Sequence, residues 1–168
     1  MARHYLSQLF APQSIAVFGA SQSPDSVGAR VFENLKQGGY PGRIHAINPK
    51  YTTINGDTCH PSIKDINECI DLAVITTPAH TIVDIIRACG DHGVSAAIVI
   101  SAGFAERGAA GHDLKKTVIE LGRQRGFGGM NGEVIVENIA MLQLVKDLGF
   151  TSVQSRDDPA VRLVSKTL

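Results

Sequence analysis

The feature that most constrains this chain is a repeated alternation between short apolar runs and segments that carry a helical stripe of apolar residues. The runs end in glycine, proline or small hydroxyl residues, and they occupy residues 14–19, 42–50, 71–78 and 95–104. The helical segments occupy residues 27–39, 79–93 and 111–126. Runs that are apolar throughout are typical of parallel strands that helices cover on both faces. The alternation therefore predicts an α/β fold with a Rossmann-like, doubly wound parallel sheet.

The pattern changes after residue 126, and we predict a boundary there between a domain of residues 1–126 and a C-terminal appendage of residues 127–168. The appendage begins with a glycine-rich stretch that does not fit the alternation. A short helix is predicted over 136–150 from apolar residues at helical spacing. Two alternating runs, 151–156 and 160–168, then flank a turn and predict a pair of antiparallel strands.

Composition and charge exclude several classes of function. The 16 Lys and Arg residues balance the 16 Asp and Glu residues, which gives no support to a nucleic-acid or anionic-membrane partner. No apolar run approaches the length that spans a bilayer, and the N-terminus lacks the apolar core of a signal peptide. The three cysteines form no C-x-x-C pair, and the six histidines have no metal-ligand spacing. We therefore expect reduced thiols, no metal site and a cytoplasmic location.

The first strand runs into a glycine loop and then a helix, a layout that often cradles a phosphate. Gly19 permits a sharp turn and a close approach of ligand to backbone. Ser21 and Ser26 supply hydroxyl groups, and Gly28 lies near the helix start, where free N–H groups and the helix dipole favour an anion. Because ligands of doubly wound sheets bind beyond the carboxyl ends of the strands, this loop is a candidate phosphate site.

The second strand ends in Asn48, Pro49 and Lys50. Folds that bind NAD place Asp or Glu at this point, where the carboxylate holds the ribose hydroxyls. A cation in place of that carboxylate favours a nucleotide with an additional phosphate on its ribose. NADP and coenzyme A (CoA) both meet this requirement.

The third and fourth strand ends carry Thr77 and Pro78, and Ser101 and Gly103. These residues add small hydroxyl groups and a backbone that a ligand can approach closely. The sequence shows no nucleophile with a paired base and no pair of carboxylates whose spacing would bring them together. The pattern predicts a site that binds a ligand without reacting with it.

Five segments within residues 4–126 carry a family resemblance: LSQLFAPQSIAVFGAS, SVGARVFENL, YPGRIHAINPK, DLAVITTPA and AAIVISAGFAE. They resemble the N-terminal CoA-binding domain of ADP-forming acyl-CoA synthetases, especially the version fused to a GNAT domain in bacterial protein lysine acetyltransferases. The resemblance implies a Rossmann-like site for CoA or acetyl-CoA, with Lys50 at a phosphate of the ligand. It also implies that the ligand is lined by Gly19, Ser21, Val27, Gly28, Thr77, Pro78, Ser101, Gly103 and Phe104.

Residues 127–168 resemble the last part of a GNAT acetyltransferase domain, in which an Asn, here Asn138, heads the helix. The sequence lacks the segments that the family places in between, which include a fifth sheet strand, a phosphohistidine domain, an ATP-grasp domain and the GNAT acetyl-CoA loop. The resemblance therefore implies an internally truncated family member that binds CoA or acyl-CoA without acetyltransferase or ligase activity of its own.

Two alternatives remain beside this interpretation. The first alternative is an NADP-binding protein similar to Rossmann oxidoreductases. The second is a gene remnant that binds no ligand. The missing fifth strand is expected to leave an exposed sheet edge, and unpaired edges recruit strands. We expect that edge to take up the tail, a second copy of the chain, or other domains of the family.

Overall fold

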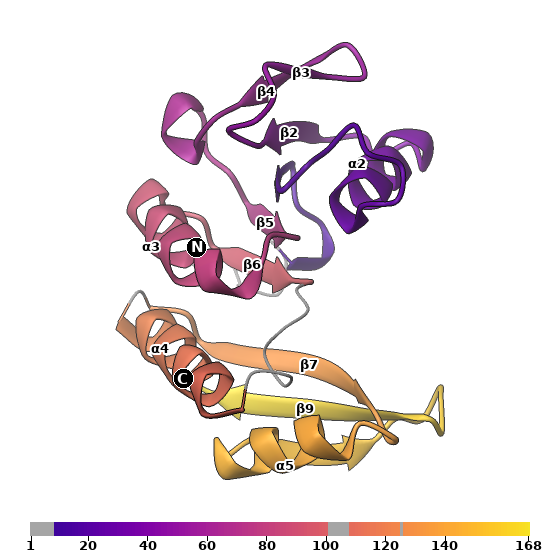
Figure 1. Ribbon diagram of the computed structural model, residues 1–168, viewed down its shortest axis with the longest axis vertical. Helices are drawn as coiled ribbons and strands as arrows, with labels where there is room; N and C mark the ends of the chain where they lie inside the picture. The colour runs from indigo at the N-terminus through magenta and orange to yellow at the C-terminus, as the bar shows by residue number, and fades with distance from the viewer. Residues whose placement is uncertain (1–8, 101–107, 125) are drawn as a thin grey trace. The chain divides into compact units, whose positions relative to one another are not determined.

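The computed structural model describes residues 9–100, 108–124 and 126–168 (Figure 1). The chain forms two compact units, one that ends at Ser101 and one that begins at Ala102. The boundary predicted after residue 126 lies inside the second unit and remains a prediction.

The first unit is built around a six-stranded sheet in the order β3-β4-β2-β1-β5-β6. Its strands are β1 (Ser14–Phe18), β2 (Arg43–Ile47), β3 (Thr53–Ile54), β4 (Asp57–His60), β5 (Leu72–Ile75) and β6 (Ala96–Val99). Neighbouring strands pair in parallel, except that β3 and β4 are antiparallel. Every residue of β1 and β5 is buried, as expected for central strands that are covered on both faces. The predicted α/β fold with a Rossmann-like parallel sheet is confirmed.

Helices cover the two faces of this sheet. Helix α2 (Val27–Gln37) and helix α3 (Ile82–His92) lie on opposite faces (Figure 1). Two 3₁₀ turns, η1 (Ile63–Asp65) and η2 (Ala79–Thr81), precede β5 and α3. The apolar core between the sheet and its cover contains Ile15, Val17, Ala20, Phe32, Ala46, Ile54, Cys59, Leu72, Val74 and Ala96.

The β3–β4 hairpin was not predicted from the sequence. It turns at Asn55 and Gly56, whose φ angles of 50° and 87° are both in the left-handed region. An Asn-Gly pair is the preferred sequence for such a two-residue hairpin turn, so the signal was present. The flanking strands are short and largely polar, and their apolar pattern was therefore too weak to be recognised.

The second unit combines two helices with a three-stranded antiparallel sheet in the order β7-β9-β8. Its elements are α4 (Gly108–Gln124), β7 (Gly129–Ile135), α5 (Ile139–Asp147), β8 (Thr151–Gln154) and β9 (Val161–Thr167). Val134, Val145 and Val164 form its buried cluster, against which Met141, Leu142 and Phe150 pack. The predicted helix and the antiparallel pairing of the last two strands are confirmed.

Residues 127–134 were expected not to fit the alternation, and no strand was predicted there, but most of them form β7 of the antiparallel sheet. This strand contains Gly129 and Gly132, and glycine weakens the strand signal of a sequence. The strand is held by its long antiparallel register with β9, which runs from Gly129 opposite Thr167 to Ile135 opposite Val161. Such pairing is invisible in the local sequence.

Strand β6 lies at the end of the sheet order in the first unit. Its residues Ile98 and Val99 and the following Ile100 are more than a third exposed. The strands of the tail form a sheet of their own, so the expected addition of a tail strand to this edge is not observed among the described residues.

Within the described parts of the chain, no helix is both long and apolar enough to cross a membrane. The same residues contain no group of His, Cys, Asp and Glu side chains arranged to hold a metal ion. The three cysteines are free thiols, with Cys59 and Cys89 buried and Cys69 exposed.

Candidate functional site

The candidate site lies where the chain reverses its direction across the sheet. Strand β1 pairs with β2 on one side and with β5 on the other, so the connections from β1 and β5 leave in opposite directions. Ligands of doubly wound sheets bind at such a switch point, beyond the carboxyl ends of the strands. The two strand ends are tied together here, because the backbone N–H and the hydroxyl of Thr76 donate to the carbonyl of Phe18 at 2.9 and 2.8 Å.

Two glycines allow the loop after β1 to pack closely on the start of α2. Gly19 has a φ of +84°, which L side chains rarely adopt, and its N–H donates to the carbonyl of Ile47 at 2.9 Å. An added Cβ on Gly28 would lie 1.9 Å from the carbonyl oxygen of Gly19 and 2.8 Å from Oγ1 of Thr76. The loop, the helix start and the end of β5 therefore form one close-packed corner that only glycine permits at residue 28.

The hydroxyl groups of the loop bond within the loop and to its neighbours. Ser26 is the N-cap of α2: its Oγ accepts from the N–H of Ala29 at 3.1 Å and donates to the carbonyl of Ser23 at 2.9 Å. Ser21 Oγ accepts from the N–H of Ser23 at 3.0 Å. Val27, at the first helical position, is 48% exposed. The cap fixes the N-terminus of α2, where the helix dipole favours an anion.

Asn48 links the end of β2 to the glycine loop. Its Nδ2 donates to the carbonyl of Ala20 at 2.7 Å, and its Oδ1 accepts from the N–H of Lys50 at 3.0 Å. Lys50 is exposed. The structure thus brings a lysine to the same sheet edge as the glycine loop.

The end of β5 contributes Thr77 and Pro78. The hydroxyl oxygen of Thr81 lies 2.8 Å from both Thr77 Oγ1 and the carbonyl oxygen of Pro78, and its single O–H closes the turn into α3. Ser101, Gly103 and Phe104, the predicted site residues after β6, lie outside the described residues.

Three residues near the carboxyl ends of the strands were not predicted as site residues from the sequence. Thr76 closes the corner between β1 and β5, Gln22 Nε2 donates to the carbonyl of Thr53 at 2.9 Å, and Tyr51 OH lies 3.5 Å from Ser21 Oγ. Gln22 bonds to a residue of the β3–β4 hairpin, and Tyr51 lies just before it, so the Asn-Gly turn of the hairpin was the available signal for this part of the edge.

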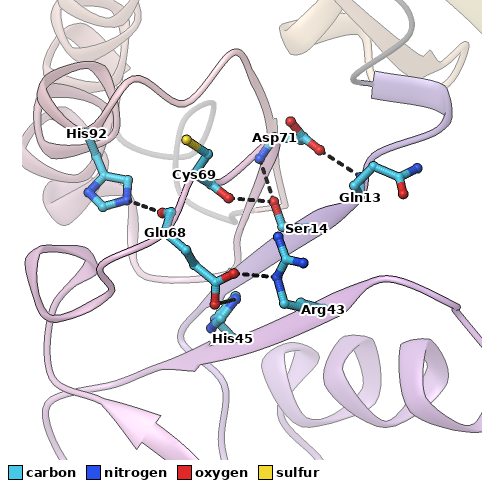
Figure 2. Close-up of polar contacts among 8 residues, drawn as sticks. All are labelled: Gln13, Ser14, Arg43, His45, Glu68, Cys69, Asp71 and His92. Atoms are coloured by element: carbon cyan, nitrogen blue, oxygen red, sulfur yellow. Dashed lines mark hydrogen bonds and ion pairs between the residues drawn. The ribbon is translucent and has the colours of Figure 1, made fainter.

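A separate polar cluster lies at the other end of the strands, near the amino ends of β1, β2 and β5, and is shown in Figure 2. Ser14 Oγ donates to the carbonyl of Cys69 at 2.8 Å and accepts from the N–H of Asp71 at 3.0 Å. Glu68 forms an ion pair with Arg43, and its carbonyl lies 3.0 Å from Nε2 of His92. These contacts hold the segment before β5 against the amino ends of β1 and β2, away from the carboxyl ends where ligands bind.

His45 lies within this cluster, on β2. Burial lowers its pKa below the ordinary value, and the nearby Glu68 carboxylate opposes that shift. Its Nε2 lies 3.1 Å from Oε1 of Glu68, but the two groups are not aligned for a hydrogen bond. The ring of His60 lies 6.1 Å away, centroid to centroid.

Comparison with known proteins identifies the family of the chain. Residues 13–156 match the sequence profile of the CoA-binding domain family. The chain belongs to that family. The match of this CoA-binding domain continues beyond residue 126, through β7, α5 and β8.

The similar proteins include ADP-forming acetate–CoA ligases. The chain is 36% identical to the acetate–CoA ligase II of Archaeoglobus fulgidus, over 73% of this chain and 18% of the ligase. It is also 36% identical to the α subunit of the acetate–CoA ligase I of Pyrococcus furiosus, over 73% of this chain and 27% of the subunit.

A solved structure supports the fold. The dinucleotide-forming acetyl-coenzyme A synthetase 1 of Candidatus Korarchaeum cryptofilum, in complex with phosphate and ADP, superposes with a TM-score of 0.68 and 32% identity. The superposition covers 74% of this chain and 28% of the synthetase. The matched part of the chain thus spans between 18% and 28% of the length of these relatives.

Proposed function

We propose that this chain binds CoA or acyl-CoA at the switch point, with the phosphates of the ligand on the glycine loop and the N-terminus of α2. The observation that carries the proposal is the corner formed by Gly19 and Gly28 in a chain of the CoA-binding domain family. A Cβ at residue 28 would collide with the carbonyl of Gly19, so glycine at this position keeps the loop packed against the start of α2, whose N-terminal N–H groups favour an anion.

Lys50 supports CoA as the ligand. It stands after β2, where dinucleotide sites that hold free ribose hydroxyls carry a carboxylate. The ribose phosphate of CoA places a dianion on this side of the adenosine, which an exposed ammonium group attracts. NADP also carries a ribose phosphate, but the family match favours CoA.

The chain supplies, in this proposal, a binding site and no chemistry of its own. The described residues that build the site are glycines, hydroxyl and amide side chains, and Lys50, and none of them forms a nucleophile–base pair. We further propose an internally truncated family member with a GNAT-like tail. Its support is the N-cap Asn138 on α5 and the antiparallel strands β8 and β9 after it.

Two further parts of the proposal concern the cellular compartment of the protein and its partner domains. Free thiols at all three cysteines fit a reducing compartment such as the cytoplasm. The exposed edge of β6 is where we propose that another domain of the family, or a second copy, pairs with this one.

Thermal unfolding with added ligand tests the function. With a micromolar dissociation constant, CoA at about 1 mM should stabilise the fold by about 4 kcal/mol and raise the melting temperature by roughly 8–16 °C. NADPH at the same concentration should have little effect. Equal stabilisation by NADPH would favour the oxidoreductase-like alternative, and no shift with either nucleotide would favour the remnant.

A further inference from the structure

Both polar atoms of the Asn48 side chain bond within the protein. Nδ2 donates to the carbonyl of Ala20 in the glycine loop at 2.7 Å, and Oδ1 accepts from the backbone N–H of Lys50 at 3.0 Å. One of the two N–H donors and one of the two acceptor directions of the amide are therefore occupied before any ligand binds. The side chain thus joins the glycine loop to the backbone of Lys50.

The backbone of Asn48 is held equally firmly. Its N–H donates to the carbonyl of His60 in β4 at 2.9 Å, and its carbonyl accepts from the N–H of Tyr51 at 3.3 Å. The preceding residue, Ile47, accepts from the N–H of Gly19. Asn48 is thus a fixed point between the sheet, the glycine loop and Lys50.

We infer that Asn48 is a positioning residue that sets the distance between the phosphate loop and Lys50, and so makes the site selective for a ligand with two separate phosphate groups. This inference rests on the proposed CoA site. The loop would bind the pyrophosphate, and Lys50 would bind the ribose phosphate. The Asn48 amide would keep the loop and Lys50 at a fixed distance from each other. A site with fixed spacing discriminates against ligands that lack one of the groups, because the unmatched cation then loses its partner.

Other contacts between the same segments provide matched controls. Gln22 Nε2 donates to the carbonyl of Thr53 at 2.9 Å, which also joins the loop to the chain after β2. No atom of Lys50 takes part in that bond. A variant without it should loosen the loop, while the bond between the N–H of Lys50 and Asn48 Oδ1 stays in place.

The test measures the dissociation constants of CoA and 3′-dephospho-CoA for variants of the full chain. The ratio compared is the dissociation constant of dephospho-CoA divided by that of CoA. In the unaltered protein dephospho-CoA should bind roughly ten- to a hundredfold more weakly, the range for a hydrogen bond between charged groups. Lys50→Ala should reduce the ratio to about one. Asn48→Ala should reduce it several-fold, whereas Gln22→Ala should weaken both ligands alike and leave the ratio unchanged.

A double variant shows whether Asn48 acts through Lys50. If it does, Asn48→Ala should change the ratio no further when Lys50 is already alanine. Asn48→Ser provides a second variant if Asn48→Ala does not fold. A serine hydroxyl can still accept from the N–H of Lys50, as in common turns, but is too short to reach Ala20, so the ratio should again fall.

The outcomes separate this inference from the proposed function. If CoA binds but Asn48→Ala and Asn48→Ser leave the ratio unchanged, Asn48 is structural and the inference is overturned while the CoA site stands. The inference is also overturned if Gln22→Ala lowers the ratio as much as Asn48→Ala does. If neither CoA nor dephospho-CoA binds to the folded protein, the proposed function itself is wrong.

Discussion

Replacing Gly28 with alanine should damage both stability and binding, because the added methyl group has no space. The new Cβ would lie 1.9 Å from the carbonyl oxygen of Gly19 and 2.7 Å from its carbonyl carbon, whereas Cβ atoms essentially never approach other heavy atoms within 3.0 Å. The neighbours are backbone atoms and the Oγ1 of Thr76, which is itself bonded to Phe18. The loop or the start of α2 must therefore move by about 1 Å.

The magnitude follows from two opposing terms. Overpacking in a close-packed region costs about 1–3 kcal/mol. Alanine in place of glycine in a helix returns up to about 1 kcal/mol, and less at the first turn. We therefore expect a net loss of about 1–2 kcal/mol in the free energy of unfolding, or roughly 2–8 °C in melting temperature for a chain of this size. CoA binding should be lost, since the displaced loop no longer presents its backbone to the phosphates.

Gly93→Ala is the matched control. Gly93 ends α3 with a φ of +81° and has open space around its Cβ position, so alanine there suffers conformational strain without a clash. It should cost about 1 kcal/mol and leave CoA affinity unchanged. Urea denaturation and calorimetry with CoA measure both quantities. A Gly28→Ala protein that is as stable as the unaltered chain and binds CoA normally would refute the reasoning from packing.

Three further predictions concern single groups. Ser26→Ala should cost about 1 kcal/mol of stability and weaken CoA binding, whereas Asn138→Ala, which removes the matching cap of α5, should cost a similar amount without affecting CoA. Burial lowers the pKa of His45, so the folded state binds fewer protons than the unfolded state. Stability should therefore be full above the unfolded pKa of about 6.5 and fall as the pH drops below it, by at most about 1.4 kcal/mol per pH unit. Burial raises the pKa of Cys89 to about 12, so iodoacetamide should modify exposed Cys69 first and Cys89 only on unfolding.

Controls separate these effects from general changes in the protein. In His45→Gln the loss of stability below pH 6.5 should be smaller, whereas substitution of the exposed His80 should leave it as it is. An unaltered acid profile in His45→Gln would assign the loss to other groups. Modification of Cys89 at the same rate as Cys69 in the folded protein would contradict the burial of the Cys89 thiol on α3.

The parallel sheet was predictable because its central strands are apolar throughout. The runs at β1 and β5 are buried at every position, and no other common element buries both faces over so few residues. Strand β7 and the β3–β4 hairpin were not predicted. Their residues are polar or glycine-rich, and they form strands because a partner strand supplies the hydrogen bonds. For β7 the local sequence does not report the distant partner β9, whereas for the hairpin the Asn55-Gly56 turn was the available signal.

The candidate site was predictable in its location and less so in its working parts. Glycines at the end of the first strand and at the helix start indicated the loop, and the structure brings Gly19 and Gly28 into contact. The sequence did not show that Asn48 is bonded to Ala20, because the two residues lie 28 positions apart in the chain. Ser26 was predicted to supply a hydroxyl group to the cofactor site, and the structure shows that hydroxyl at the N-cap of α2. Direct contacts between these residues and CoA remain predictions.

The central claim is that the corner at Gly19 and Gly28 holds CoA. Calorimetric titration of the purified chain with CoA, with NADPH as the comparator, tests it most directly. We predict one CoA site per chain with a dissociation constant in the micromolar range, which corresponds to about −8 kcal/mol, and no measurable heat with NADPH. The absence of CoA binding by protein that is folded by circular dichroism would contradict the account.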